Sequence, residues 1–334
     1  MPSGLKPPIL LFGNNRSGTT IVQKVMSTHP EIVPWYEPRN LWLFADPGRP
    51  HDEFDASDAT DRVKRYIRRR FLQFQRRHGD RRVLEKTPAS ILKIPYVAEI
   101  FPEANLMFIV RDPFSFISSL EMKWQRPVSL KGIARHLTST PPSQLHFYAG
   151  RVMRQRFEKR VLRRKYLSLW GPRYIGMDQD LKTTDLLTVI ARQWSVCSRK
   201  AEEAMARFDH GRILRLKYET FVENPVLELE RICAHTGVSM TNEMVRAANE
   251  WVKSDRQQKW RRFDPRDLAR LLPELEGEMR RHGYTVPAEI LEAAADLSHD
   301  SAEPVSTSRD SARRIRRAAE ANREPLASSP LLDQ

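Results

Sequence analysis

The chain has 334 residues, of which 40% are hydrophobic and 29% charged, and its formal net charge is +14. This composition is ordinary for a globular protein, and the length suits one large α/β domain with additions and a real core. The positive charge favours anionic ligands, which leaves nucleic acid, anionic lipid, a phosphorylated cofactor and an acidic substrate open.

Targeting and redox features favour a cytoplasmic protein. No apolar run approaches the ~20 residues that a membrane-spanning helix requires, and no signal peptide is visible. The two cysteines, Cys197 and Cys233, lack the spacing of a zinc site and the density of a disulfide scaffold. We therefore expect buried thiols in a reducing compartment, with peripheral contact to the cytosolic face of a membrane left open.

Strand-like and helix-like segments alternate along the chain. Short apolar runs typical of buried parallel strands lie at residues 9–12, 31–35, 83–84, 106–110 and 213–216. Amphipathic stretches typical of helices lie at residues 59–78, 89–101 and 184–207. This alternation predicts an α/β fold with a mainly parallel sheet flanked by helices, and ligands at the carboxyl ends of the strands.

Two further segments do not follow this alternation. Residues 121–183 carry four prolines and two very basic stretches, so we expect a helical insertion at the rim of the sheet. From residue 300 onward Ser, Pro, Ala and Arg dominate, which predicts a disordered basic tail over 300–334 with a candidate short helix at 311–322. The expected domain therefore covers residues 1–299.

The segment GNNRSGTT at residues 13–20 lies between the first strand and a helix. It nearly matches the phosphate-binding loop G-x-x-x-x-G-K-[ST], but Thr19 stands where the lysine belongs and Arg16 is the strong cation of the loop. Such a turn aims backbone N–H groups at one point, where Arg16 could clamp a phosphate and Ser17, Thr19 and Thr20 could donate hydrogen bonds. A helix cap that binds nothing is the alternative.

A second motif, LMFIVRDPFSFISSL, occupies residues 106–120. Arg111 lies at the carboxyl end of the expected strand, and Ser119 follows eight residues later, about two turns into the next helix. One anion could therefore meet both side chains. The alternatives are a structural salt bridge between Arg111 and Asp112 and a merely exposed serine.

Together, the two motifs resemble those of the sulfotransferases that use 3′-phosphoadenosine 5′-phosphosulfate (PAPS). Residues 15–20, which include Gly18, match the family's 5′-phosphosulfate loop, and Arg111 with Ser119 matches its 3′-phosphate motif. Further similar segments are EKTPAS at 85–90, LKYETFVENP at 216–225, KWRRF at 259–263 and GY at 283–284, so the resemblance spans roughly residues 8–284. It implies a P-loop-like sulfotransferase fold in which the helical insertion over residues 121–183 lies on the acceptor side, with PAPS as donor, 3′-phosphoadenosine 5′-phosphate (PAP) as product, and no metal.

The resemblance also implies catalytic roles. Arg16 would stabilise charge on the oxygen between phosphorus and sulfur, and Lys86 would neutralise the transferring sulfonate. The family's cytosolic animal members use a histidine as base, but Pro88 stands at that position here. Glu37 is then the expected base, as in tyrosyl-protein and several bacterial-type members.

Other residues carry weaker expectations. Pro38 should hold Glu37 in an extended conformation, although Glu37 could instead be a surface carboxylate paired with Arg39. Tyr218 corresponds to a family tyrosine that borders the adenosine, and ordinary core packing is its alternative. Residues 253–256 depart from the family's Arg-Lys-Gly segment, which closes over the 3′-phosphate.

Three functions remain open. The leading one is a sulfotransferase acting on a hydroxyl of a carbohydrate, glycolipid, small alcohol or tyrosine. The others are a nucleotide-dependent kinase or hydrolase with a degenerate phosphate loop, and a non-enzymatic basic protein that binds nucleic acid, although no nucleic-acid-binding motif is visible. The Arg-rich stretches at 62–82 and 151–165 are either solvated helix faces or contacts for an acidic acceptor or an anionic membrane.

Overall fold

The computed structural model describes residues 4–124, 171–209, 211–253 and 258–302, which belong to two compact units, Met1–Thr285 and Val286–Gln334. Most of the predicted insertion, the basic stretch at 151–165, residues 254–256 and the candidate helix at 311–322 lie outside the described residues. The unit boundary falls before the predicted domain end at residue 299, so the single domain over 1–299 stays a prediction.

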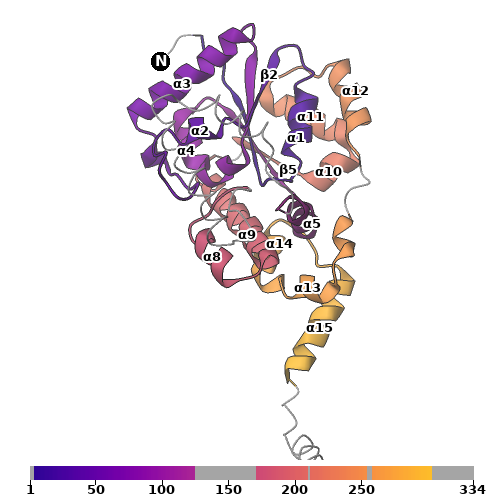
Figure 1. The fold of residues 1–334 in the computed structure, drawn as a ribbon. Coiled ribbons are helices and arrows are strands. Elements are labelled where there is room, and N and C mark those ends of the chain that lie inside the picture. Colours follow the sequence, from indigo (N-terminus) through magenta and orange to yellow (C-terminus); the bar gives the residue numbers. More distant parts are fainter. Residues whose placement is uncertain (1–3, 125–170, 210, 254–257, 303–334) are drawn as a thin grey trace, which may run out of the picture. The chain divides into compact units, whose positions relative to one another are not determined.

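The first unit is built on a five-stranded sheet whose strands pair in parallel (Figure 1). The strands are β1 (Ile9–Gly13), β2 (Ile32–Tyr36), β3 (Arg82–Lys86), β4 (Asn105–Val110) and β5 (Ile213–Lys217), in the order β2-β3-β1-β4-β5. Each strand lies at a predicted position, and the predicted parallel α/β fold is confirmed. Because β1 pairs with both β3 and β4, the loop that follows it leaves from the centre of the sheet.

Four helices pack against one face of the sheet. These helices are α1 (Thr19–Met26), α10 (Tyr218–Glu223), α11 (Pro225–Thr236) and α12 (Asn242–Trp251). Their apolar side chains join Ile9, Leu11 and Met107 of the sheet in one buried cluster. Because β1 is buried along its whole length, its carboxyl end and the loop after it have a rigid support.

The remaining helices of the first unit complete the layers around the sheet (Figure 1). They are α2 (Arg39–Trp42), α3 (Asp61–Arg77), α4 (Ile94–Ile100), α5 (Pro113–Trp124), α8 (Met177–Thr183), α9 (Leu186–Met205), α13 (Pro265–Ala269) and α14 (Leu272–Arg281), with the 3₁₀ turns η1 (Ala56–Asp58), η2 (Pro88–Lys93) and η4 (Lys259–Arg262). The helices predicted over 59–78 and 184–207 are confirmed as α3 and α9. The one predicted over 89–101 is 3₁₀ in its first half, because Pro95 lacks the N–H that would continue an α-helix from the preceding turn.

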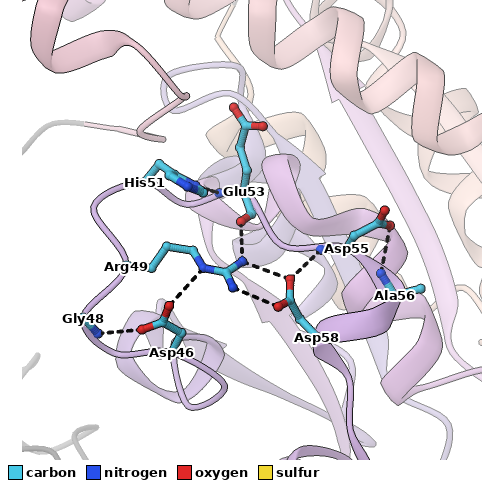
Figure 2. Close-up of polar contacts among 8 residues, drawn as sticks. All are labelled: Asp46, Gly48, Arg49, His51, Glu53, Asp55, Ala56 and Asp58. Carbon is cyan, nitrogen blue, oxygen red and sulfur yellow. Dashed lines mark hydrogen bonds and ion pairs between the residues drawn. The ribbon is translucent and has the colours of Figure 1, made fainter.

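The loop between α2 and α3 is held by Arg49 (Figure 2). Its guanidinium donates two hydrogen bonds to the Asp58 carboxylate, at 2.9 and 2.8 Å, and one to the Glu53 carbonyl, at 2.9 Å. The hydrogen bond with Asp58 raises the pKa of Arg49, and the same bond lowers the pKa of Asp58. This clamp fixes the path of the loop, which also carries the buried residue Asp52.

The second unit contains α15 (Ala288–Ala302). This alanine-rich helix covers the first three residues of the predicted tail, and the disorder predicted over 300–334 stays a prediction. In the described part of the chain, no helix is both long and apolar enough to cross a bilayer. Cys197 and Cys233 are buried free thiols, as predicted, and burial raises the pKa of both.

Candidate active site

The loop after β1 ends in the open N-terminus of α1. The first N–H group of α1 that makes a hydrogen bond along the helix is that of Ile21, which donates to the Gly18 carbonyl at 3.0 Å. The N–H groups of Gly18, Thr19 and Thr20 have no hydrogen-bond partner within the described ranges. Unpaired N–H groups at the positive end of a helix bind an oxyanion, so the loop has the donors that its sequence predicts.

Gly18 is required by both its backbone and its neighbour. Its φ is +93°, and a Cβ atom there would lie 2.3 Å from the ring of Tyr218. On the same ring lies the guanidinium of Arg111, with its Cζ 4.3 Å from the ring centroid. The structure therefore packs three predicted cofactor-binding residues against one another, although β1, β4 and β5 bring them from distant parts of the sequence.

The two predicted anion-binding arginines also share one region. Nε of Arg16 donates to Oγ of Ser119 at 2.9 Å, and a guanidinium nitrogen of Arg111 donates to the Arg16 carbonyl at 3.0 Å. Arg16 has a φ of 72°, a left-handed conformation that is costly for a residue with a side chain. Ser17 is fully buried, and its hydroxyl lacks a partner among the residues described. The predicted contact of this hydroxyl with a ligand stays a prediction.

The turn after β4 is held by residues for which the sequence predicts no role. Trp194 donates its indole N–H to the Arg111 carbonyl at 2.9 Å. Glu219 accepts from the Asp112 N–H at 3.0 Å and from the Tyr284 hydroxyl at 2.9 Å, and burial raises the pKa of Glu219. Glu219 and Tyr284 lie in segments that resemble the family, but the sequence alone does not predict that they form a hydrogen bond with each other.

The helix that carries Ser119 is capped and buttressed. The Asp112 carboxylate accepts from the Ser115 N–H at 2.7 Å and so caps α5, a different role from the salt bridge with Arg111 that was the alternative. Arg262, in the KWRRF segment, donates to the Ser118 carbonyl at 3.2 Å and pairs with Glu121. This arginine is a further residue that sequence reasoning missed, because its contact with α5 joins segments more than a hundred residues apart.

A second group of predicted residues meets at the ends of β2 and β3. Nζ of Lys86 donates to Oε1 of Glu37 at 2.6 Å and to Oγ1 of Thr20 at 3.1 Å. The Lys86 side chain is 4% exposed, whereas that of Glu37 is 38% exposed. Thr20 belongs to the first turn of α1, so this chain of hydrogen bonds connects the anion-binding loop to an accessible carboxylate.

The backbone of Glu37 differs from the prediction. Its φ is 49°, so it is left-handed and not extended. Pro38, with φ −74° and ψ 58°, and the hydrogen bond from the Arg39 N–H to the Glu37 carbonyl at 2.7 Å form an inverse γ-turn. Arg39 pairs with Asp52 at 2.6 Å, while Glu37 pairs with Lys86, so the alternative pairing of Glu37 with Arg39 is wrong.

A buried carboxyl group lies next to Lys86 in the strand. Glu85 is 2% exposed, and burial raises its pKa from 4.5 to about 7. The hydroxyl of Thr87 donates to it at 2.5 Å. Glu85 was visible in the EKTP segment, but its burial could not be inferred from the sequence.

No group of three or more His, Cys, Asp or Glu side chains suited to a metal ion is found among the described residues. The absence of a metal from the reaction stays a prediction. The arrangement itself offers helix N–H groups, two arginines, a buried lysine and a carboxylate, which suits the binding and transfer of an anionic group.

Comparison with known proteins agrees with this chemistry. The model of the sulfotransferase family matches residues 7–169 and 156–242. Nodulation protein NoeE of Sinorhizobium fredii is 25% identical over 39% of this chain and 37% of its own length. Protein-tyrosine sulfotransferase 1 of Danio rerio is 27% identical over 34% of this chain and 35% of its own length, so the matches span little more than a third of either relative.

Among solved structures, the sulfotransferase domain from the curacin biosynthetic pathway is 15% identical to the chain, with a TM-score of 0.47. The match covers 88% of this chain and 98% of that domain. The family model alone spans well over half of the chain. The chain therefore belongs to the sulfotransferase family.

Proposed function

We propose that this chain is an enzyme that moves the sulfo group of PAPS to a hydroxyl group of an acceptor. The hydrogen-bond chain from Thr20 through Lys86 to Glu37 carries the proposal, because it ties the anion-binding loop to an exposed carboxylate. An acceptor hydroxyl needs such a carboxylate to take its proton as it attacks. Family membership supports sulfo transfer over phosphoryl transfer.

The residues around the loop fit the two phosphates of the donor. The N–H groups of Gly18, Thr19 and Thr20 and the guanidinium of Arg16 would hold the 5′-phosphate. Arg111 and Ser119 would hold the 3′-phosphate, and Tyr218, on which Arg111 lies, would border the adenosine. The bound donor supplies an activated sulfo group, whose departure leaves negative charge on a phosphate.

Three residues would act where the sulfo group is transferred. Glu37 has the exposed carboxylate and would take the acceptor's proton. Lys86 would keep that carboxylate in place and neutralise charge on the group in transit. Arg16, whose Nε donates to Ser119 in this structure, would act on the leaving phosphate through its terminal guanidinium nitrogens.

Calorimetric titration with PAP tests the nucleotide part of the proposal. We expect PAP to bind without added magnesium, and PAPS to be converted to PAP when a hydroxyl acceptor is present. Magnesium-dependent turnover of ATP with no response to PAP would contradict the proposal and favour a kinase or hydrolase. Steeply salt-dependent binding of oligonucleotides without PAP binding would favour a nucleic-acid-binding protein.

The acceptor is proposed only as a class. Carbohydrate, glycolipid, small alcohol and tyrosine hydroxyls all remain candidates, and tyrosine has the support that one relative is named a protein-tyrosine sulfotransferase. Residues 125–170, which the sequence assigns to the acceptor side, are outside the described part.

The outer face of α3 supports peripheral contact with an anionic membrane as part of the proposal. Its inner basic residues pair with acids, Lys64 with Glu99 and Arg68 with Glu103. The exposed arginines at 62, 65, 69 and 76 follow helical spacing and have no ion pair among the described residues. Each could contribute about 1 kcal/mol at an anionic surface.

Sedimentation with vesicles tests this contact. The chain should pellet with vesicles that contain phosphatidylserine and not with pure phosphatidylcholine, and replacing the four exposed arginines by glutamine should abolish the difference. Equal sedimentation of the two proteins would contradict the membrane contact without affecting the proposed reaction. The cytoplasmic location also stays a prediction.

A further inference from the structure

Asp52 is a buried carboxylate that joins three segments of the chain. It is 2% exposed, and its Oδ2 accepts from a guanidinium nitrogen of Arg39 at 2.6 Å and from the N–H of Arg173 at 2.9 Å. Its Oδ1 lies 3.7 Å from Nζ of Lys93, whose side chain is fully buried. The N–H of Asp52 donates in turn to the Arg173 carbonyl at 2.7 Å.

These contacts fix Arg39 in one position. A charge buried this deeply is stable only when it is paired, and Arg39, at 2.6 Å, lies closer to Asp52 than Lys93 does, at 3.7 Å, so Asp52 holds the Arg39 guanidinium firmly. The loop around Asp52 is itself fixed, because Arg49 clamps it to Asp58 (Figure 2). Asp52 is therefore a rigid anchor for Arg39, which follows Glu37 by two positions.

Arg39 is connected to Glu37 through the inverse γ-turn at Pro38. The left-handed backbone of Glu37, with φ 49°, persists only where its surroundings hold it from more than one side. On one side, the Glu37 N–H donates to the Lys86 carbonyl at 3.2 Å. On the other, the Arg39 N–H donates to the Glu37 carbonyl at 2.7 Å, and Arg39 is held by Asp52.

We propose that Asp52 is a positioning residue for Glu37, acting through Arg39 and touching no substrate. This inference rests on the proposed role of Glu37 as the base. Asp52 sets the backbone from which the Glu37 carboxylate reaches Lys86, and its bonds to Arg173 couple that geometry to the segment that follows residue 170. Loss of the anchor should therefore slow the proton-removal step while leaving the nucleotide site intact.

The test is the substitution Arg39→Met, which cuts the link but leaves Asp52 bonded to the Arg173 backbone and close to Lys93. Asp52→Asn is the direct variant, but it leaves two cations around an uncharged group and can fail to fold. Activity is measured as PAP release from PAPS with N-acetyl-tyrosinamide as acceptor, because its phenol, with a pKa of about 10, is protonated at neutral pH and needs a base. We expect kcat to fall by about 10- to 100-fold, as for a catalytic group displaced by ~1 Å, while the Kd for PAP stays within about twofold.

Two further variants separate positioning from general damage. In a Glu37→Gln background, adding Arg39→Met should cause no further loss of kcat, because both changes remove the same function. Lys200→Met is the matched control, because it breaks the ion pair with Glu53, next to Asp52 in the same loop, and has no connection to Glu37. It should leave kcat near the wild-type value.

Several results would overturn the inference. These are an unchanged kcat in Arg39→Met, a rise only in the KM for N-acetyl-tyrosinamide, additive losses in the double variant, or an equal loss in Lys200→Met. A Glu37→Gln protein with full activity would overturn the proposed base and the positioning role together. A large loss in Glu37→Gln with none in Arg39→Met would overturn the positioning role alone.

Discussion

The ammonium group of Lys86 lies 2.6 Å from a carboxylate oxygen of Glu37. The lysine is buried and the carboxylate is half-exposed, so solvent can reach the Glu37 carboxylate while the Lys86 charge stays fixed beside it. Thr20 extends the contact to the loop that receives the donor's phosphate in the proposed reaction. The proposed base and the proposed site of the leaving phosphate are thereby held in one hydrogen-bonded unit.

Replacing Lys86 by methionine should separate binding from transfer. We expect the rate of PAP release from PAPS to fall by roughly 100-fold or more, because a preorganised cation is lost from the reacting centre. Calorimetry should show PAP binding within a fewfold of the wild type, since the arginines remain. Lys24→Met is a suitable control, because this lysine of α1 is exposed and makes no hydrogen bond or ion pair with Lys86, Glu37 or Thr20. A Lys86→Met protein with normal turnover would remove Lys86 from the reaction.

Arg111→Ala should weaken binding of PAP selectively. A hydrogen bond to a charged group contributes about 1.5–3 kcal/mol, so the affinity should fall roughly 10- to 100-fold. Titration with adenosine 5′-monophosphate is the control, because it lacks the 3′-phosphate and should lose much less affinity. If both nucleotides lose affinity equally, Arg111 supports the fold of the site and does not bind the 3′-phosphate.

Gly18→Ala should abolish nucleotide binding. The added methyl group would meet the Tyr218 ring at 2.3 Å, and the φ of +93° is itself unfavourable for alanine. Gly79→Ala is a matched control, because its φ is also positive, at +72°, but nothing lies within 4 Å of the new atom. Calorimetry should therefore show PAP binding in Gly79→Ala, which should lose only about 1–2 kcal/mol of unfolding free energy. Normal PAP binding by Gly18→Ala would contradict the close packing of this loop.

Glu85 should make stability depend on pH. Because burial raises its pKa from 4.5 to about 7, the folded chain holds a proton in this range that the unfolded chain has lost. The unfolding free energy due to Glu85 is therefore highest below pH 4.5, falls as pH rises from 4.5 to about 7, and levels off above it. Melting curves of Glu85→Gln should show a gain over the wild type that is larger at about pH 8 than at about pH 4. A gain that does not vary with pH would show that Glu85 does not titrate as described.

The sequence was sufficient for features that depend on neighbouring residues. Strand positions follow from apolar runs, and the Gly18 turn and the placement of Arg111 at a strand end follow from local spacing. The parallel sheet then brings both to one edge, because parallel strands all end on the same side. The meeting of Arg111, Tyr218 and Gly18 was predictable for this reason.

The missed features all depend on contacts between distant segments. Arg39 could equally have paired with Glu37 by sequence, and only the folded loop shows that it pairs with the buried Asp52. The left-handed backbone of Glu37 reflects restraints from β3 as well as from Pro38. The bond between Tyr284 and Glu219 likewise joins residues 65 positions apart. Such pairings depend on the tertiary distance, which composition and periodicity do not encode.

Sulfo transfer itself is measured by incubation with PAPS that carries a radiolabelled sulfo group, in an extract that supplies hydroxyl acceptors. We expect the wild-type chain to move the label to an acceptor and form PAP, and Lys86→Met to form neither product at a comparable rate. Label that stays in PAPS with the wild-type chain, or moves equally fast with Lys86→Met, would contradict this expectation.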